Sequence, residues 1–432
     1  MLLGNRNQQG GIIGIELSDR YAQLSFWAAG TENPETPPQC PPELGEDTMI
    51  PVLLCKRLDR DVWAYGKEAA RIAAQGEGIL VDRLLSRALA GESAVVDGEA
   101  YECTSLLALF LKRSLSLLDA RLHPERADML MITLEKVGQE ERSLIASLAS
   151  LLSLPSERMA CQSRAESFFY YNINQPEELW RHPCMICDFS GEWMKTLIFE
   201  AGHQSRPVVV TVQEQDFPEM NRETAGAAAH REAEKARLDA KFCEVLRQVC
   251  AGRVIDTVYL IGDGFDGEWY DASLGILCKG RRVFQGNNLY SKGACYGGKA
   301  KSVGIPPRER GFVYLGADML GANAGLVASR GGNDVYYPLL EAGTNWFDAH
   351  GECDFLLDRD LSFSLRITPM GSREAKEVVV TLDGVPERPP RTTRIHLTVS
   401  CPDAPSVPPP VPQGSPQDRS SCLLGCCSAL PL

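Results

Sequence analysis

Two carboxylates stand at the ends of strand-like apolar segments and are the residues best placed to do chemistry. Glu16 follows the run Gly11–Ile15, and Asp188 closes the run Cys184–Cys187. Each run leads through a polar turn into a second strand-like segment, as expected of a β-hairpin. If the two hairpins face one cleft, Glu16 and Asp188 could hold a hydrated Mg²⁺, because hard cations take carboxylate oxygens. The alternative is that both carboxylates accept hydrogen bonds from nearby backbone amides.

Small residues near these carboxylates could let a ligand approach the backbone. Ser18 and Gly191 lie in the two hairpin turns, and Gly262 and Gly264 follow the apolar run Val258–Ile261. Bare backbone amides in such turns can bind a phosphate group or lie against an adenine or a ribose. A tight strand-to-helix turn that needs no ligand also explains the two glycines after the run, and we slightly favour it.

The elements that must position these residues form an α/β region followed by a β-rich region. The apolar run Met129–Leu134 is typical of a buried strand, and the periodicity of Leu144–Leu152 and Glu223–Cys250 predicts amphipathic helices. From about residue 311 onward, short alternating segments separated by turn residues predict an all-β domain. After Cys401 the chain is rich in proline, and we expect a disordered tail.

The composition is that of a globular protein, and it excludes some classes of partner. Hydrophobic residues make up 44% and charged residues 23% of the chain, and the formal net charge is -13. Because negative charge repels phosphate backbones, we expect no nucleic-acid partner. We also expect no membrane partner, since the sequence has neither a long apolar run nor a secretory signal. The fifteen scattered cysteines indicate buried thiols and a cytoplasmic location.

Several short segments occur in the order found in one known family. Gly14-Ile-Glu-Leu-Ser-Asp19 is similar to a first phosphate loop, Cys187-Asp-Phe-Ser-Gly191 to a second, and Leu260-Ile-Gly-Asp-Gly264 to an adenosine loop. Tyr337-Pro-Leu-Leu-Glu-Ala-Gly-Thr344 is similar to the start of a chaperone's β-sandwich domain. Taken in order, these segments resemble the actin-like ATPase superfamily, and specifically a bacterial branch of the DnaK-type heat-shock chaperones.

The resemblance implies a fold and its boundaries. The fold would be a two-lobed α/β core of the actin- and DnaK-like (ribonuclease-H-like) type plus a C-terminal all-β, sandwich-like domain. The core would span residues 11–305, with lobe I at about 11–180 and lobe II at about 181–305. Residues 310–401 would form the β-rich domain, which would bind a peptide or protein partner, and residues 402–432 the tail.

The resemblance also implies cofactors, namely ATP or ADP with Mg²⁺. Glu16 and Asp188 would bind the metal. The residues that would bind the nucleotide are Glu16, Ser18, Asp188, Gly191, Gly262 and Gly264.

The positions that carry the family's chemistry nevertheless differ in this chain. They are Ser18 and Asp19 in the first loop, Glu192 and Trp193 in the second, Asp82 at the place of a catalytic lysine, and Gln162 at that of a glutamate. Asp19 would repel a phosphate, Trp193 would crowd the second loop, and Gln162 cannot act as a base. We therefore expect a degenerate ATPase that binds nucleotide weakly or not at all. The alternative is an active, ATP-dependent chaperone-like ATPase.

Overall fold

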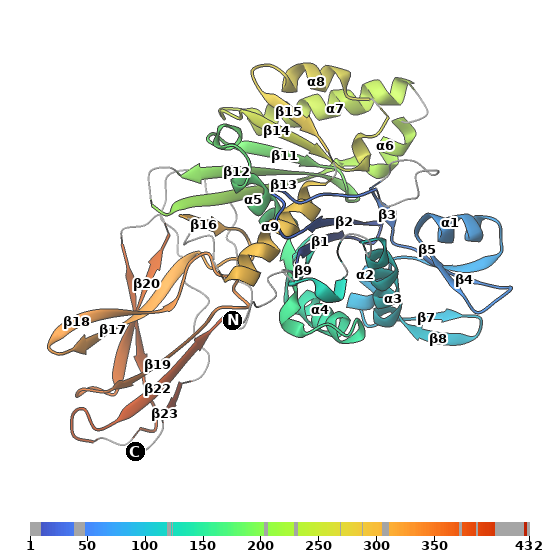
Figure 1. The fold of residues 1–432 in the computed structure, drawn as a ribbon. Coiled ribbons are helices and arrows are strands. Elements are labelled where there is room, and N and C mark those ends of the chain that lie inside the picture. The colour runs from blue at the N-terminus through green and yellow to red at the C-terminus, as the bar shows by residue number, and fades with distance from the viewer. Residues whose placement is uncertain are drawn as a thin grey trace, which may run out of the picture. The chain divides into compact units, whose positions relative to one another are not determined.

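Mixed α/β structure in the first part of the chain gives way to β-sheets in the second (Figure 1). The computed structural model describes residues 10–38, 48–118, 122, 124–202, 206–228, 232–267, 269–286, 288–304, 311–370, 374–385, 388–401 and 427–429. The chain divides into two units, Met1–Phe312 and Val313–Leu432. The predicted α/β class with a β-rich C-terminal region is confirmed.

The first sheet of unit one is built around the predicted N-terminal hairpin. Strand β1 (Ile12–Leu17) pairs antiparallel with β2 (Tyr21–Trp27) and parallel with β9 (Met129–Leu134). Adding β10 (Met159–Ser163) and β3 (Ile50–Pro51) gives the order β10-β9-β1-β2-β3. Every residue of β1 and β9 is buried. A strand covered on both faces must be largely apolar, which is why these strands are visible as apolar runs.

The second sheet of unit one repeats this topology. Strand β11 (Cys184–Asp188) pairs antiparallel with β12 (Trp193–Gly202) and parallel with β14 (Thr257–Ile261). Strand β15 (Arg282–Gln285) lies parallel beyond β14, and β13 (Val208–Asn221) lies antiparallel beyond β12. Each sheet thus contains one hairpin flanked on the same side by two parallel strands. The two hairpins therefore place Glu16 and Asp188 in corresponding positions.

Helices pack on these sheets. Helix α9 (Leu289–Val303) contacts β1, β9 and α5 (Arg164–Ile173), and α7 (Glu232–Cys250) contacts β13. The apolar face predicted for α7 is confirmed, since Leu238, Phe242 and Leu246 are buried in the core beside the second sheet. The remaining helices of this part are α3 (Cys103–Leu115), α4 (Gln139–Leu151), α6 (Arg222–Ala228) and α8 (Asp271–Leu277).

A smaller layer follows the first hairpin. Its three-stranded sheet has the order β5-β4-β6 and is covered by α1 (Gly66–Ala74). The buried side chains of Cys55, Ala64 and Ile72 form its core. The strands of this sheet are β4 (Leu54–Arg57), β5 (Trp63–Tyr65) and β6 (Gly78–Val81). The chain continues through α2 (Leu84–Leu89), β7 (Ser93–Val96) and β8 (Glu99–Glu102).

Unit two contains two antiparallel sheets that share one hydrophobic core. Their orders are β18-β17-β20-β21 and β19-β22-β23. Leu326 and Leu365 from the first sheet and Leu397 from the second belong to the same buried cluster. The strands near or in this unit are β16 (Phe312–Leu315), β17 (Ala322–Arg330), β18 (Asn333–Leu340), β19 (His350–Leu356), β20 (Ser362–Pro369), β21 (Lys376–Thr381), β22 (Arg394–Ser400) and β23 (Cys427–Ala429).

The end of the chain differs from its prediction in one short segment. The prediction of a disordered tail at 402–432 is wrong for Cys427–Ala429, which form β23 and pair with β22. Backbone hydrogen bonds to a neighbouring strand need no apolar run, so composition alone did not indicate this strand. The rest of that tail lies outside the described residues.

Among the helices that the structure describes, none combines the length and the apolar character needed to cross a membrane.

Candidate functional site

The two predicted carboxylates come together through an arginine that the sequence analysis missed. Arg164, the first residue of α5, places Nη2 3.2 Å from Glu16 Oε1 and Nη1 3.5 Å from Asp188 Oδ2. All three residues are buried, with Glu16 1%, Asp188 3% and Arg164 8% exposed. A guanidinium thus bridges the carboxylates of the two hairpins, and the three residues form what we call the Glu16–Arg164–Asp188 cluster.

Two tyrosines complete the shell of this cluster. Tyr21, which begins β2, donates a 3.2 Å hydrogen bond to Glu16 Oε1. Tyr290 in α9 donates a 2.8 Å hydrogen bond to Asp188 Oδ2, and its ring lies 5.5 Å from the Arg164 guanidinium carbon. Asp188 Oδ1 accepts hydrogen bonds from the backbone and the hydroxyl of Ser190. Among the described residues, Glu16 Oε2 has no hydrogen-bond partner.

The electrostatics of the cluster make Glu16 its titratable member. Burial raises the pKa of Glu16 to about 7, the charge of Asp188 adds to this, and Arg164 and Tyr21 oppose it. Burial disfavours the charge of Arg164, but Asp188, Tyr21 and Glu16 hold its pKa well above the ordinary value. Burial and the neighbouring carboxylates raise the pKa of Tyr21 and of Tyr290. The arginine therefore stays charged and both phenols stay protonated, so that near neutral pH a proton can exchange on Glu16.

The Glu16–Arg164–Asp188 cluster does not fit the Mg²⁺ predicted for Glu16 and Asp188. A divalent cation between these carboxylates would face the guanidinium, which already supplies the positive charge. In the part of the chain that the structure describes, no group of three or more His, Cys, Asp or Glu side chains could hold a metal ion. The alternative that both carboxylates bond to local amides is met only by Asp188, through Ser190.

Two backbone amides at the start of the second hairpin turn already have partners within the protein. The backbone amide of Phe189 donates to Ile261 O at 2.8 Å, and that of Ser190 donates to Asp188 Oδ1 at 2.9 Å. Its carbonyl oxygens are taken as well, because the guanidinium of Arg222 donates to those of Phe189, Ser190 and Gly191. A phosphate cradle needs unpaired N–H groups. The turn that contains Gly191 is instead closed around an arginine.

The glycines after β14 are required by the packing of this same turn. Gly262 has φ +101°, and a Cβ on it would lie 2.4 Å from Phe189 C and from Ser190 N. A Cβ on Gly264 would lie 2.2 Å from the ring of Phe189. The absence of a side chain lets the chain after β14 lie against the second hairpin. This is the explanation that the sequence analysis slightly favoured.

The first hairpin turn is also closed by its own residues. Ser18 Oγ accepts hydrogen bonds from the backbone amides of Arg20 and Tyr21 and donates to Tyr21 O at 3.0 Å. Asp19 Oδ1 accepts a 2.9 Å hydrogen bond from the backbone amide of Ser86 in the first turn of α2. Asp19 therefore caps a helix, which accounts for a carboxylate in this loop without a metal.

Two further positions that differ from the chaperone pattern, Gln162 and Trp193, have partners outside the cluster. Gln162 is fully buried and donates to Ser167 Oγ at 2.8 Å and to Gly293 O at 3.4 Å, between α5 and α9. Trp193 begins β12, opposite Asn221 of β13. In the described part of the chain, neither side chain forms a hydrogen bond or an ion pair with Glu16, Arg164 or Asp188, so we assign both to the packing of their own elements.

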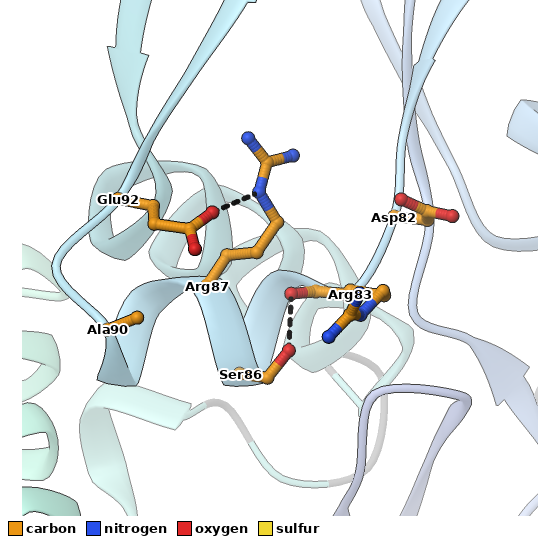
Figure 2. Close-up of a pocket in the computed structure, with 6 residues that line it drawn as sticks. All are labelled: Asp82, Arg83, Ser86, Arg87, Ala90 and Glu92. Carbon is orange, nitrogen blue, oxygen red and sulfur yellow. Dashed lines mark hydrogen bonds and ion pairs between the residues drawn. The ribbon is translucent and has the colours of Figure 1, made fainter.

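A surface hollow of about 470 Å³ contains the remaining position, Asp82 (Figure 2). Arg87 on its wall pairs with Glu92 at 3.1 Å, and Ser86 Oγ donates to Arg83 O at 3.3 Å. The residues that line it are Asp82, Arg83, Ser86, Arg87, Ala90 and Glu92. None of them belongs to the Glu16–Arg164–Asp188 cluster, so Asp82 does not supply a charge there.

The sequence carried one signal that could have revealed Arg164. The segment from Arg164 to Ile173 is apolar or aromatic for most of its length, and the structure buries all of it except Tyr171, Arg164 included. A cation at the first position of a helix is disfavoured by the helix dipole unless anions lie nearby. An arginine in that place therefore predicts a nearby carboxylate, although it does not say which one.

Two family models match the chain. The model described as the C-terminal part of a family of unknown function (DUF5716) matches residues 40–317, which is more than half of the chain. A domain of unknown function (DUF8552) matches residues 319–408. No curated protein matches the chain. The two matches meet close to the division between the structural units at Phe312 and Val313.

Proposed function

We propose that this chain, which belongs to the family of unknown function DUF5716, is a non-catalytic relative of the actin- and DnaK-like ATPases that serves as an interaction module. Its N-terminal core would keep the two-lobed architecture of those proteins. It would bind ATP or ADP weakly or not at all. Its C-terminal β-rich unit would bind a peptide or protein partner.

The sheet topology supports the proposed relationship. A ribonuclease-H-like core repeats a hairpin flanked by parallel strands, and the orders β10-β9-β1-β2 and β15-β14-β11-β12 follow this scheme. The carboxylates of Glu16 and Asp188 occupy equivalent ends of β1 and β11. Such a likeness concerns the fold, and function must be argued from the site.

The observation that carries the loss of catalysis is the position of Arg164. In an ATPase of this kind the two carboxylates would face Mg²⁺ and phosphate, whereas here they face a guanidinium within 3.5 Å. Removing that guanidinium would be costly, because it would leave Asp188, and Glu16 whenever it is ionised, as buried charges without a cation. The cluster therefore favours a core that stays assembled without nucleotide.

The proposed partner site is the edge of the first sheet in unit two. Among the strands that the structure describes, β18 pairs only with β17 in that sheet, and Val335, Tyr336 and Tyr337 on it are 41%, 39% and 50% exposed. An exposed edge strand can accept an extended segment through backbone hydrogen bonds, and aromatic side chains add contact area. An extended peptide is thus the kind of partner that we propose.

A cytoplasmic location is part of the proposal. Cys55, Cys103 and Cys187 are buried free thiols. Burial raises the pKa of Cys55 and of Cys103, which keeps these thiols protonated and unreactive. Free thiols persist most readily in a reducing compartment.

Calorimetric titration of the full chain with ATP and ADP, with and without Mg²⁺, tests the loss of nucleotide binding. We expect no saturable heat from the wild type. Mg²⁺-dependent binding that disappears in Asp188→Ala and persists in the control Asp354→Ala, a carboxylate of unit two, would instead support an active ATPase. Circular dichroism of each variant checks that it is folded.

A further inference from the structure

Two arginines from the neighbourhoods of the two hairpins converge on one carboxylate. Arg20, in the turn between β1 and β2, places Nη2 2.8 Å from Asp263 Oδ2. Arg222, the first residue of α6, donates to Asp263 Oδ2 from Nη1 at 2.9 Å and to Oδ1 from Nη2. Asp263 lies just after β14, between the two close-packed glycines. The carboxylate is therefore held by three charge-assisted hydrogen bonds.

The Arg222 guanidinium has partners besides Asp263, and the backbone of Arg20 is fixed by its own turn. The Arg222 guanidinium also donates to the carbonyl oxygens of Gly191 at 2.5 Å and Ser190 at 2.7 Å. The backbone amide of Arg20 donates to Ser18 Oγ at 3.2 Å, within a turn that Tyr21 closes. Removing the carboxylate would therefore leave the Arg222 guanidinium in position, with Arg20 anchored nearby through its backbone.

Solvent reaches this group of residues. The side chains of Arg20, Asp263 and Arg222 are 47%, 33% and 23% exposed, respectively. Two guanidinium groups against one carboxylate leave one positive charge in excess. Planar guanidinium forks bind phosphate and carboxylate oxygens with the same bidentate geometry, so the chemistry that binds Asp263 also suits a phosphate group.

We infer that Arg20 and Arg222 form an anion site for a phosphate group, and that Asp263 fills this site as an internal anion. An incoming phosphate would meet the charge of Asp263 as well as the two arginines, so it would bind only where Asp263 gives way. The inference rests on the proposed function, because it names the group that keeps phosphate out of a core without nucleotide. Asp263 is then the residue that keeps a phosphate group away from Arg20 and Arg222.

The test compares the full-length wild type with Asp263→Asn, which keeps the shape of the side chain and removes its charge. Inorganic pyrophosphate is titrated by calorimetry at low salt, where ionic attraction is least screened, and without divalent cations. We expect Asp263→Asn to bind pyrophosphate at least about tenfold more tightly than the wild type, the size of one charge-assisted contact. Adding Arg20→Ala to this variant should remove the gain.

Asp354→Asn is the matched control, because Asp354 pairs with Arg394 at 3.0 Å in unit two and its replacement changes the net charge equally. A folded Asp263→Asn variant that binds pyrophosphate no better than the wild type would overturn the inference, as would an equal gain in Asp354→Asn. If Asp263→Asn does not fold, Asp263→Ser is compared in the same way. Mg²⁺-dependent ATP binding by the wild type would overturn the proposed function, and the pyrophosphate comparison would still decide the anion site.

Discussion

Arg164 Nη1 lies 3.5 Å from Asp188 Oδ2, and this ion pair joins a helix that follows the first sheet to a strand of the second. The same guanidinium reaches Glu16 in the first sheet. Glu135, which follows β9, and Lys195 of β12 form a second ion pair. The two halves of unit one are therefore connected by side chains of opposite charge, and Arg164 forms the buried one of these two ionic connections.

Replacing Arg164 should destabilise unit one strongly. Arg164→Ala leaves Glu16 and Asp188 buried without their cation, and breaking a buried pair in this way typically costs about 3 to 5 kcal/mol. Urea unfolding followed by circular dichroism measures the loss. Arg60→Ala is the control, since the Arg60–Asp59 pair is 60% and 57% exposed and should contribute about 1 kcal/mol or less. A loss no larger than that of Arg60→Ala would show that the carboxylates do not need Arg164.

Glu16 should make the stability of unit one depend on pH. Because burial raises its pKa from 4.5 to about 7, the folded chain binds a proton on Glu16 more tightly than the unfolded chain does. This contribution is fully present below 4.5 and is lost as the pH rises through about 7. The free energy of unfolding of the wild type should therefore fall over this range, relative to Glu16→Gln.

The measurement is urea unfolding at a series of pH values for the wild type, Glu16→Gln and the control Glu232→Gln. Glu232 is 91% exposed, so Glu232→Gln removes a surface carboxylate as the matched control. Identical pH profiles for the wild type and Glu16→Gln would contradict the role given to Glu16.

Because Gly262 packs closely against the second hairpin, Gly262→Ala should lower the free energy of unfolding more than the same change at a second glycine. Gly262 and Gly267 have φ +101° and +95°, but a Cβ on Gly267 would meet nothing within 4 Å. Gly267→Ala should cost only the backbone strain, about 1 to 2 kcal/mol. Gly262→Ala should cost clearly more, since its Cβ would overlap the backbone of Phe189 and Ser190. Equal losses in urea unfolding would mean that the chain after β14 can move away from the hairpin.

Gly191 should tolerate a side chain. The nearest atom to a Cβ on Gly191 is Trp193 O at 3.6 Å, an ordinary contact, and its φ is not positive. Gly191→Ala should therefore change the free energy of unfolding by no more than about 0.5 kcal/mol. It should also leave the calorimetric response to ATP unchanged. A glycine that cradles phosphate would behave differently, so loss of a wild-type nucleotide signal in Gly191→Ala would argue for a working phosphate loop.

The strands around the site could be predicted because their signal is local. Met129–Leu134 and Val258–Ile261 are apolar runs, and the structure buries every residue of β9 and β14. Burial on both faces selects apolar residues at consecutive positions, so a short window of sequence is enough to recognise such a strand. The two carboxylates at the hairpins were found for the same reason, as polar residues that interrupt or end such runs.

What each carboxylate would meet could not be predicted in the same way. Gly191 was expected to bind a phosphate, yet its turn is closed by Arg222, which follows β13 and lies 31 residues further along the chain. For Gly262 and Gly264 the sequence left open a ligand or a tight turn, with the turn slightly favoured, and it did not show that they would lie against Phe189. These contacts join segments that are distant in the chain, and no local pattern encodes them.

The sequence by itself determined the α/β class, the β-rich C-terminal region, the two hairpins and the positions of Glu16 and Asp188 within them. Only the tertiary structure decided that Arg164 lies between these carboxylates and that Asp263 lies between Arg20 and Arg222. Burial leaves a periodic trace in the sequence because it acts on each residue of an element separately. An ion pair requires two side chains to meet in space, and that meeting depends on the whole fold.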